Sequence, residues 1–317
     1  MITHVLILVA MAVLLREDEV RALASMGQVI EAVAAATADL GRELAQNQPR
    51  RRVFPASGVL NVMSASWATA GVFGLKTYSV MAGRARFVVL LYGPDGSLSG
   101  LIEADHLGAL RTGAASAVAA RALAPAGPLS VGVIGTGKQA GTQIDALREV
   151  LQIAELRVYG RDQGRREAFA GRHGARAVDS ARACVEGCDV VVTMTTAREP
   201  VLESDWIGAQ TLVIAAGSNY PNRRELPADL VHRARAIVVD QRATAELESG
   251  DLLLADYSVE RALELGGVLA GLDLVPEGPA PLIFESHGLA LWDIAAAHAV
   301  LLEAGAHGVG ESVAFGG

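Results

Sequence analysis

Residues 131–140 join an apolar, β-forming run to small residues at fixed spacing. Gly135 and Gly137 end the run, and Ala140 stands in the first turn of the helical pattern that follows. In the G-x-G-x-x-A form of the dinucleotide fingerprint, the first glycine permits a tight turn, the second leaves room for a pyrophosphate, and the third small residue lets the helix pack on the strand. The helix N-terminus presents free N–H groups to the phosphates. This context predicts a dinucleotide site formed by Gly135, Thr136, Gly137, Lys138, Gln139 and Ala140.

The tip of the next strand selects between the two nicotinamide cofactors. An acidic residue there binds the ribose 2′-OH of NADH, whereas an arginine accommodates the 2′-phosphate of NADPH. The strand predicted over residues 156–159 ends in Gly160, and Arg161 and Asp162 follow. Because a guanidinium pairs well with phosphate, Arg161 favours NADPH as the cofactor. NADH, with Asp162 on the ribose, is the alternative.

Two threonines follow a further strand of this region. The strand predicted over residues 189–193 runs into Thr193-Met194-Thr195-Thr196. Ligands of open α/β sheets bind outside the carboxyl ends of the strands. We therefore expect Thr193 and Thr195 to lie beside the dinucleotide.

Three basic residues precede the glycine motif and are candidates to bind a small carboxylate. Arg51 lies in a proline-flanked turn, Lys76 interrupts an apolar β-forming stretch, and Arg111 lies in a predicted helix. A buried lysine needs a partner, and a carboxylate would be one, while arginine offers it a two-pronged hydrogen bond. The spacing alone does not show that the three converge. For each residue the alternative is a surface position or a structural ion pair.

The first hundred residues predict a helix followed by a mainly antiparallel sheet. A first strand at 12–15 precedes a helical pattern without proline over residues 17–44. The sequence Gly93-Pro94-Asp95-Gly96 is a hairpin turn signal. An alanine-rich helix over residues 105–124 leads to a boundary at the Pro/Gly-rich residues 125–128. The strands expected between the two helices are 59–63, 71–80, 87–92 and 98–103.

From residue 129 the pattern changes to apolar strands that alternate with helices, as in a parallel sheet buried on both faces. We expect an α/β protein with a Rossmann dinucleotide-binding domain at residues 126–282. An α+β substrate-binding and dimerisation domain would comprise residues 1–125 and 283–317, because a helix over 289–304 returns to it. The expected strands of the Rossmann domain are 130–134, 156–159, 175–178, 189–193, 211–215 and 236–239, with a further one at 282–285.

Composition and charge restrict the possible partners. The chain has 317 residues, 51% of them hydrophobic, which suits two domains around a large core. Its net charge of −8 argues against nucleic acid as a partner. Cys184 and Cys188 fall on one predicted helix with no histidine at ligand spacing. We expect no metal site and no disulfide, but small buried side chains in a reducing, cytoplasmic environment.

The apolar residues 5–15 resemble neither a signal peptide nor a membrane span. No basic segment precedes them, no clear small-residue cleavage site follows, and the run is too short to cross a bilayer. We therefore expect no membrane partner. Met11 is a possible natural start, which would make residues 1–10 an upstream extension.

Taken in order, these features resemble the ornithine cyclodeaminase/mu-crystallin family over nearly the whole chain. Each matching motif is modest alone, but the set in this order is specific. The motifs lie at residues 48–51, 53–55, 74–76, 111–114, 131–140, 217–226, 238–240 and 286–288.

The resemblance implies a Rossmann domain inserted after an N-terminal sheet domain that forms a homodimer. It implies that Lys76, Arg111 and Arg51 hold the carboxylate of a small substrate. Thr112 and Gly217 would then lie by the cofactor, and Ser286 or Asn219 would orient the substrate nitrogen or a water.

Asn219 departs from part of the family. Cyclodeaminases and related alanine dehydrogenases carry an aspartate at this position, and in cyclodeaminases this aspartate is thought to assist proton transfers. The amide of Asn219 cannot act as a general base in the same way. Mu-crystallin, which is similar to ketimine reductases, also lacks this acid and has an arginine at the second strand tip. The chain thus resembles the ketimine and imine reductases more than the cyclodeaminases, although Asn219 could instead be a turn residue.

The resemblance therefore implies an NADPH- or NADH-dependent reductase that transfers hydride to the α-carbon of an imino acid. Cyclic ketimines such as pyrroline- or piperideine-2-carboxylate, and linear imines of 2-oxo acids, are the expected substrates. Lys76 and Asn219 are the candidate catalytic residues. One alternative is an NAD-dependent ornithine cyclodeaminase or alanine-type dehydrogenase. The other is a non-catalytic protein that binds NADPH or a small ligand.

Overall fold

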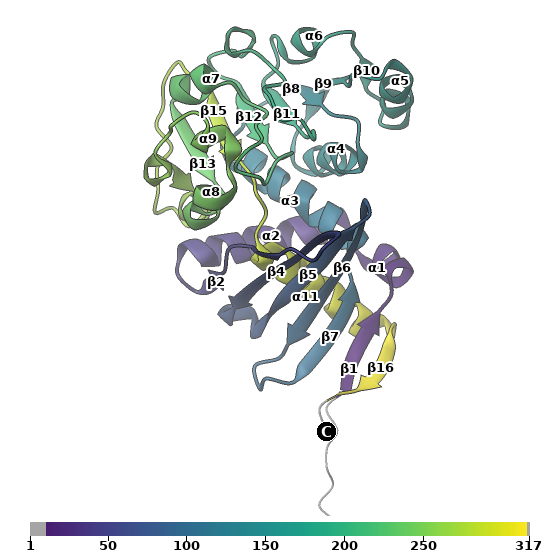
Figure 1. The fold of residues 1–317 in the computed structure, drawn as a ribbon. Coiled ribbons are helices and arrows are strands. Elements are labelled where there is room, and N and C mark those ends of the chain that lie inside the picture. Colours follow the sequence, from purple (N-terminus) through teal and green to yellow (C-terminus); the bar gives the residue numbers. More distant parts are fainter. Residues whose placement is uncertain (1–10, 316–317) are drawn as a thin grey trace, which may run out of the picture.

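The structure, a computed structural model, describes residues 11–315 and shows two lobes joined by α3 (Asp105–Leu123) (Figure 1). The hypothesis that residues 1–10 are an upstream extension lies outside the described residues. Within residues 11–315, no helix combines the length and the hydropathy needed to cross a bilayer.

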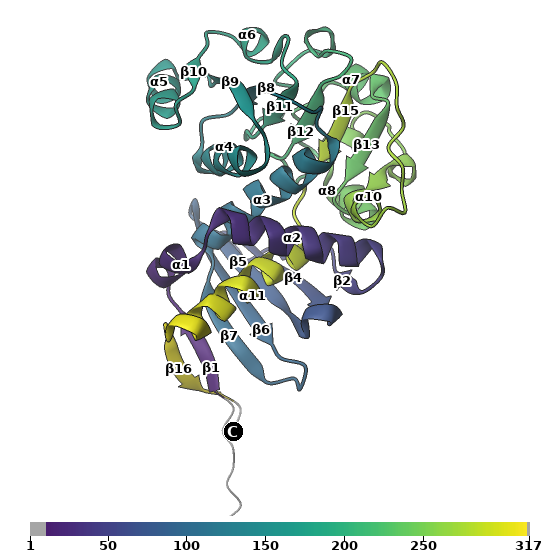
Figure 2. The ribbon, with the colours of Figure 1, turned by 180° about the vertical axis from the view of Figure 1, so that it is seen from behind.

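The N-terminal lobe is a mixed sheet with α2 (Met26–Gly41) and α11 (Ala290–His307) across one face (Figure 2). The strand order is β16-β1-β7-β6-β5-β4-β2, with β3 paired to β4. The four long strands pair antiparallel in the predicted order, and the turn at residues 93–96 joins the last two. The strands are β1 (Met11–Leu15), β2 (Ala45–Asn47), β3 (Arg51–Val53), β4 (Gly58–Trp67), β5 (Val72–Met81), β6 (Arg84–Tyr92), β7 (Leu98–Glu103) and β16 (Glu311–Ala314), with a short η1 (Ala68–Ala70) between β4 and β5.

The prediction of one helix over residues 17–44 is wrong. The segment forms α1 (Glu17–Leu23) and α2, because Ser25 starts a new helix by accepting a hydrogen bond from the Gln28 N–H at 3.3 Å. Serine followed three residues later by glutamine is a capping signal. The break lets α2 turn and lie along the sheet.

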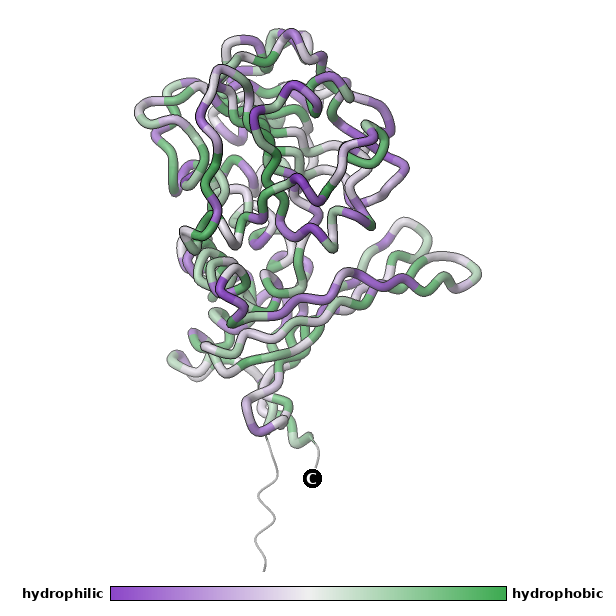
Figure 3. The backbone as a smooth tube through the Cα atoms, turned by 90° about the vertical axis from the view of Figure 1, so that its left-hand side faces the viewer, coloured by the Kyte–Doolittle hydropathy of each residue, from purple (hydrophilic) through white to green (hydrophobic). Residues whose placement is uncertain are grey.

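The Rossmann lobe is an eight-stranded parallel sheet in the order β10-β9-β8-β11-β12-β15-β13-β14. Hydrophobic stretches, green in Figure 3, run through its centre. The predicted strands all form, and only the short β14 is unforeseen. The strands are β8 (Leu129–Ile134), β9 (Ile153–Tyr159), β10 (Arg176–Ala177), β11 (Val190–Thr193), β12 (Leu212–Ala215), β13 (Ala236–Val239), β14 (Leu263–Glu264) and β15 (Leu282–Glu285). The helices are α4 (Lys138–Val150), α5 (Gln163–Arg172), α6 (Ala181–Val185), α7 (Ala228–Arg233), α8 (Arg242–Glu248), α9 (Gly250–Leu253) and α10 (Leu265–Leu269), with η2 (Ser204–Trp206) and η3 (Val259–Arg261).

The chain returns to the N-terminal lobe directly after β15, which pairs with β12 and β13 before α11 packs on the first sheet. The predicted boundary after residue 282 thus falls inside β15, and the change of lobe comes after Glu285. This return places the ends of both sheets close together.

The two cysteines are buried and free. Burial raises the pKa of Cys184 to about 12 and that of Cys188 to about 11, so both thiols stay protonated at neutral pH. The prediction that both lie on one helix is wrong, because α6 ends at Val185 and Cys188 follows the Gly187 turn.

Candidate active site

A cavity of about 880 Å³ lies at the carboxyl ends of β8, β9, β11 and β12. Chain order reverses between β8 and β11, which is where doubly wound sheets bind their ligands. Predicted cofactor residues supply much of the lining: Gly135, Thr136, Gly137, Lys138, Gln139, Ala140, Arg161, Asp162, Thr195 and Gly217.

The glycine turn between β8 and α4 has the geometry that a pyrophosphate requires. Gly135 has φ +128°, and a Cβ there would lie 2.2 Å from the carbonyl oxygen of Met194. A Cβ on Gly137 would instead meet no atom of the described residues within 4 Å, so the backbone borders open space beside the start of α4. These residues fit a dinucleotide phosphate at the helix N-terminus.

The strand tip carries no acidic side chain. A Cβ on Gly160 would lie 2.8 Å from the side chain of Thr136, so a larger residue there would require the Thr136 side chain to move. Arg161 and Arg165 are exposed and line the cavity. Asp162 caps α5: its Oδ1 accepts a hydrogen bond from the Arg165 N–H at 2.7 Å. One of the two carboxylate oxygens of Asp162 is therefore already engaged.

Two predicted cofactor residues lie outside the lining of this cavity. Thr193 is fully buried and donates to Glu225 Oε2 at 3.0 Å. Thr112 is buried in α3 and donates to the carbonyl oxygen of Gly108 at 2.8 Å. Both hydroxyls are therefore engaged by neighbouring protein groups.

Lys76 and Arg111 meet on one buried carboxylate that the sequence analysis missed. Lys76 Nζ donates to Asp293 Oδ1 at 2.7 Å, and Arg111 Nε donates to the same oxygen at 3.0 Å. The aspartate is in the first turn of α11 and has no exposed surface. Burial lowers the pKa of Lys76 to about 8, although the attraction of Asp293 opposes this shift. Two cations thus share one anion, which leaves one positive charge in excess.

The structure does not bring Arg51 to this cluster. Arg51 pairs with Val62 in the β3–β4 register and shares the exposed face of the strand with it. Since alternate residues of a strand point to opposite faces, its neighbours Arg50 and Arg52 point the other way, and both form ion pairs with the buried Glu248 of α8. Within this motif, Arg50 and Arg52 therefore face Glu248, and Arg51 faces away from it.

Asn219 and Ser286 lie at the junction of the two lobes. The carbonyl oxygen of Asn219 accepts a hydrogen bond from Arg52 Nη2 at 3.0 Å. The ring of the next residue, Tyr220, lies under the Arg52 guanidinium at 5.0 Å. Ser286 is buried after β15, and its N–H donates to the carbonyl oxygen of Ala215 at 2.9 Å.

A charged group behind this junction was also not foreseen. His287 Nδ1 lies 3.3 Å from Asp240 Oδ1, and its Nε2 lies 3.5 Å from Glu285 Oε2. Burial opposes the charged imidazole, but the two carboxylates raise the pKa of His287 to about 10. The N–H groups of His287 and Gly288 both donate to Asp240 Oδ2 at 2.7 Å. This network fixes the chain where it leaves the Rossmann sheet.

The cation cluster and the dinucleotide cavity share one edge of the Rossmann sheet. A Cβ on Gly288, just beyond β15, would lie 2.7 Å from Arg111 Nη1. β15 pairs directly with β12, whose end carries the cavity residue Gly217. Neighbouring strands lie about 4.8 Å apart, so the segment that contacts Arg111 leaves the sheet beside the segment that carries Gly217.

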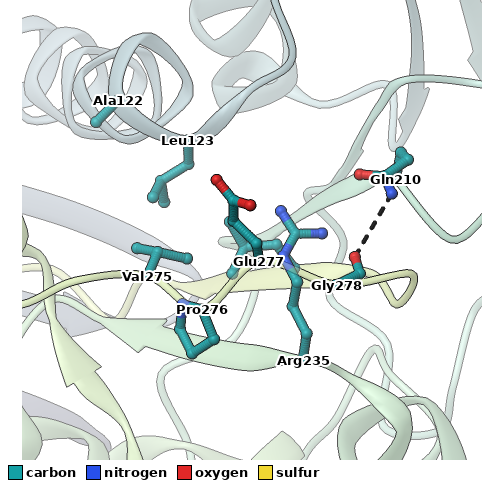
Figure 4. A pocket seen from close by; sticks show the side chains of 9 residues that line it. Ala122, Leu123, Gln210, Arg235, Val275, Pro276, Glu277 and Gly278 are labelled. Atoms are coloured by element: carbon teal, nitrogen blue, oxygen red, sulfur yellow. Dashed lines mark hydrogen bonds between the residues drawn. The ribbon is translucent and has the colours of Figure 1, made fainter.

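A second cavity, of about 550 Å³, lies near the opposite ends of the Rossmann strands. Figure 4 shows Arg235 and Glu277 at its wall, with Gln210 donating to the carbonyl oxygen of Gly278 at 3.5 Å. It is remote from the glycine turn and from the Lys76 cluster, and we assign it no role.

The fold and the site define an oxidoreductase that uses a nicotinamide dinucleotide and acts on a small anion. The sequence profile of the ornithine cyclodeaminase/mu-crystallin family matches residues 10–306, and the chain belongs to this family. This confirms the resemblance predicted from the sequence. The fold class and the nicotinamide cofactor class are confirmed by the similar structures with bound NAD or NADH described next.

Several relatives and solved structures are similar to this chain over most of their length. The chain is 32% identical to the ketimine reductase mu-crystallin of Mus musculus over 270 residues, which is 80% of this chain and 84% of the relative. An archaeal alanine dehydrogenase dimer with bound NAD superposes with a TM-score of 0.91 at 30% identity, covering 97% of this chain and 100% of that one. The Thermococcus litoralis Delta(1)-pyrroline-2-carboxylate reductase, in complex with NADH and L-proline, superposes with a TM-score of 0.87 at 30% identity. This match covers 95% of this chain and 100% of that one.

Proposed function

We propose that the protein reduces the C=N bond of imino acids to give amino acids. The dinucleotide, when bound, supplies a hydride from C4 of its nicotinamide ring. The observation that carries the proposal is the pair Lys76 and Arg111, which share the buried carboxylate of Asp293, with Arg111 lying against Gly288 just after β15. Relatives named ketimine reductase and pyrroline-2-carboxylate reductase support this choice of reaction.

Lys76 and Arg111 would hold the substrate carboxylate, because Asp293 neutralises only one of their two charges. The anchored carboxylate places the adjacent α-carbon toward the nicotinamide, and such orientation accounts for much of the rate of hydride transfer. Arg50, rather than Arg51, is the arginine of the 48–51 motif that lies on this side of the sheet.

The substrate nitrogen would enter already protonated, since an iminium is the better hydride acceptor. The hydride adds to the α-carbon, and the electron pair of the C=N bond becomes the lone pair of the product amine. No protein group has to donate a proton before this step, which fits an amide at Asn219. Asn219 and Ser286 would orient the nitrogen or a water beside it.

We infer a preference for NADPH over NADH. Arg161 and Arg165 line the cavity next to Gly160, so the strand tip presents basic rather than acidic side chains. A guanidinium pair favours the 2′-phosphate of NADPH.

We further propose a homodimer built on the open face of the N-terminal sheet. The helices cover only the other face, and Leu60, Val62, Phe73 and Met81 of β4 and β5 are exposed hydrophobic residues. A related alanine dehydrogenase is described as a dimer. We place the enzyme in the cytoplasm, which suits its two free thiols.

Cofactor consumption with a panel of imines tests the function. The panel would hold pyrroline- and piperideine-2-carboxylate, and 2-oxo acids mixed with ammonia or methylamine, each with NADPH and NADH. We expect turnover of at least one imino acid with a free carboxylate and none of an imine that lacks it. Conversion of ornithine to proline and ammonia without net change of cofactor would instead identify a cyclodeaminase.

A further inference from the structure

Glu225 is a fully buried carboxylate that the proposed chemistry does not use. It lies on the segment between β12 and α7, in the motif that follows Asn219. Three groups donate to its two oxygens: the Thr195 N–H to Oε1 at 2.7 Å, the Gly217 N–H to Oε2 at 2.9 Å and the Thr193 hydroxyl to Oε2 at 3.0 Å.

The donors belong to the ends of two neighbouring strands. Thr193 ends β11 and Thr195 follows it, while Gly217 follows β12. Thr195 and Gly217 both line the dinucleotide cavity. The segments are so close that a Cβ on Gly217 would lie 2.4 Å from Thr195 N and 2.5 Å from Glu225 Oε2. One carboxylate thus joins two walls of the cavity.

The backbone of Glu225 makes a third connection to the cavity wall and is itself fixed. Its carbonyl oxygen accepts the N–H of Val201, another lining residue, at 2.8 Å. Its own N–H donates to Asp251 Oδ1 at 2.8 Å, and the Leu226 N–H donates to the same oxygen at 2.6 Å. Asp251 lies in α9. The backbone of Glu225 is therefore fixed by α9, while its side chain is fixed by Thr193, Thr195 and Gly217.

We propose that Glu225 is a positioning residue for the dinucleotide, which shapes the walls at Thr195 and Gly217 without touching the ligand. Two inward-pointing N–H groups and a hydroxyl need an acceptor there, and water cannot reach this buried position. A glutamine would present an NH2 group to one of these donors. The proposal rests on the cofactor site and is independent of which imine is reduced.

The electrostatic surroundings of Glu225 provide a signature beyond stability. Burial raises its pKa to about 7, and the hydrogen bonds from Thr195, Thr193 and Gly217 oppose this shift. The charged groups behind it are the carboxylates of Asp251 on α9 and, next to that, Glu285 on β15. Protonation below about pH 7 converts one acceptor oxygen into a hydroxyl, which loosens the same walls.

The test is the dissociation constant of the binary complex, read from nicotinamide fluorescence. For Glu225→Gln we expect the dissociation constants of NADPH and NADH to rise about tenfold, because a charge-assisted hydrogen bond is replaced by a donor–donor contact. With NADH, which lacks a titrating 2′-phosphate, wild-type binding should weaken from pH 8 to pH 6, and this change should be absent in the variant. Thr211→Val is the control: this buried hydroxyl donates to the carbonyl oxygen of Cys188 at 2.7 Å just before β12, at the end of the strand opposite to Gly217, so its loss should lower the melting temperature but leave the dissociation constant within about twofold.

A folded Glu225→Gln protein that binds NADH as wild type does, with the same pH dependence, would overturn the proposal. If this variant does not fold, Thr193→Val decides, since it removes one donor at nearly constant volume. We expect about a threefold rise in the NADH constant, and an unchanged constant would overturn the proposal. Wild-type protein that binds dinucleotide but reduces no imine would refute only the proposed reaction.

Discussion

Lys76 Nζ lies 2.7 Å from Asp293 Oδ1, a contact that joins strand β5 to helix α11 across 217 residues of sequence. Because Arg111 donates to the same oxygen, the aspartate aligns two cations on one side of the cleft. A carboxylate substrate completes this arrangement by taking up the remaining positive charge. The proposed reaction depends on this three-residue group.

Replacing Lys76 by methionine should impair substrate binding and leave cofactor binding intact. Truncating one partner of a buried charge pair costs about 2–5 kcal/mol, so we expect kcat/KM for the imino acid to fall by at least about thirtyfold. The chain has only one other lysine, Lys138, which lines the dinucleotide cavity. Lys138→Met is the matched control and should weaken NADPH while leaving the KM of the imino acid nearly unchanged.

The KM of the imino acid should rise above about pH 8. The folded protein holds the pKa of Lys76 at about 8, below the ordinary lysine value, so its charge is present below this pH and is lost as the pH rises through it. Asp293→Asn removes the attraction that favours the ammonium, and the rise in KM should then begin at lower pH. If KM depends on pH in the same way in the wild type and in Asp293→Asn, Lys76 does not bind the substrate carboxylate.

Arg161→Asp should change cofactor choice. Loss of the guanidinium and gain of a repelling carboxylate should weaken NADPH by at least about tenfold, while NADH changes little. Equal loss for both cofactors, in dissociation constants measured side by side, would show that Arg161 does not contact the 2′-phosphate.

Arg50 and Arg51 should behave differently although they are adjacent. Arg50 is buried against Glu248, and removal of one member of a buried ion pair costs about 3 kcal/mol. Arg51 is exposed, where substitutions change stability by less than about 0.5 kcal/mol. Chemical denaturation of Arg50→Met and Arg51→Met compares the two, and a larger loss for Arg51→Met would contradict the register described for β3.

Local sequence signals predicted the parts of the site that depend on local structure. The glycine turn, the strand tip at Gly160 and the positions of most Rossmann strands follow from short-range patterns, and these formed as expected. The side to which Arg51 points could not be predicted, because a proline-flanked turn carries no periodicity that shows which residues of a three-residue strand share a face.

The acidic partners were missed because long-range packing creates them. Asp293 reaches Lys76 only after the chain returns from the Rossmann lobe, and Glu225 acts on backbone N–H groups that no motif displays. One signal was present: Asp293 is a charged residue in the apolar first half of α11, the same kind of anomaly that identified Lys76. That reasoning, applied to residues 290–300, would have found it.

The most direct measurement follows the hydride itself. The protein is incubated with NADPH deuterated at C4 and with a cyclic imino acid such as piperideine-2-carboxylate, and the product is examined by mass spectrometry. We predict an amino acid with a single deuterium at the α-carbon, formed by the wild type and largely absent with Lys76→Met. Oxidation of the cofactor without label in the product, or no labelled amino acid from any cyclic or linear imino acid, would contradict the account.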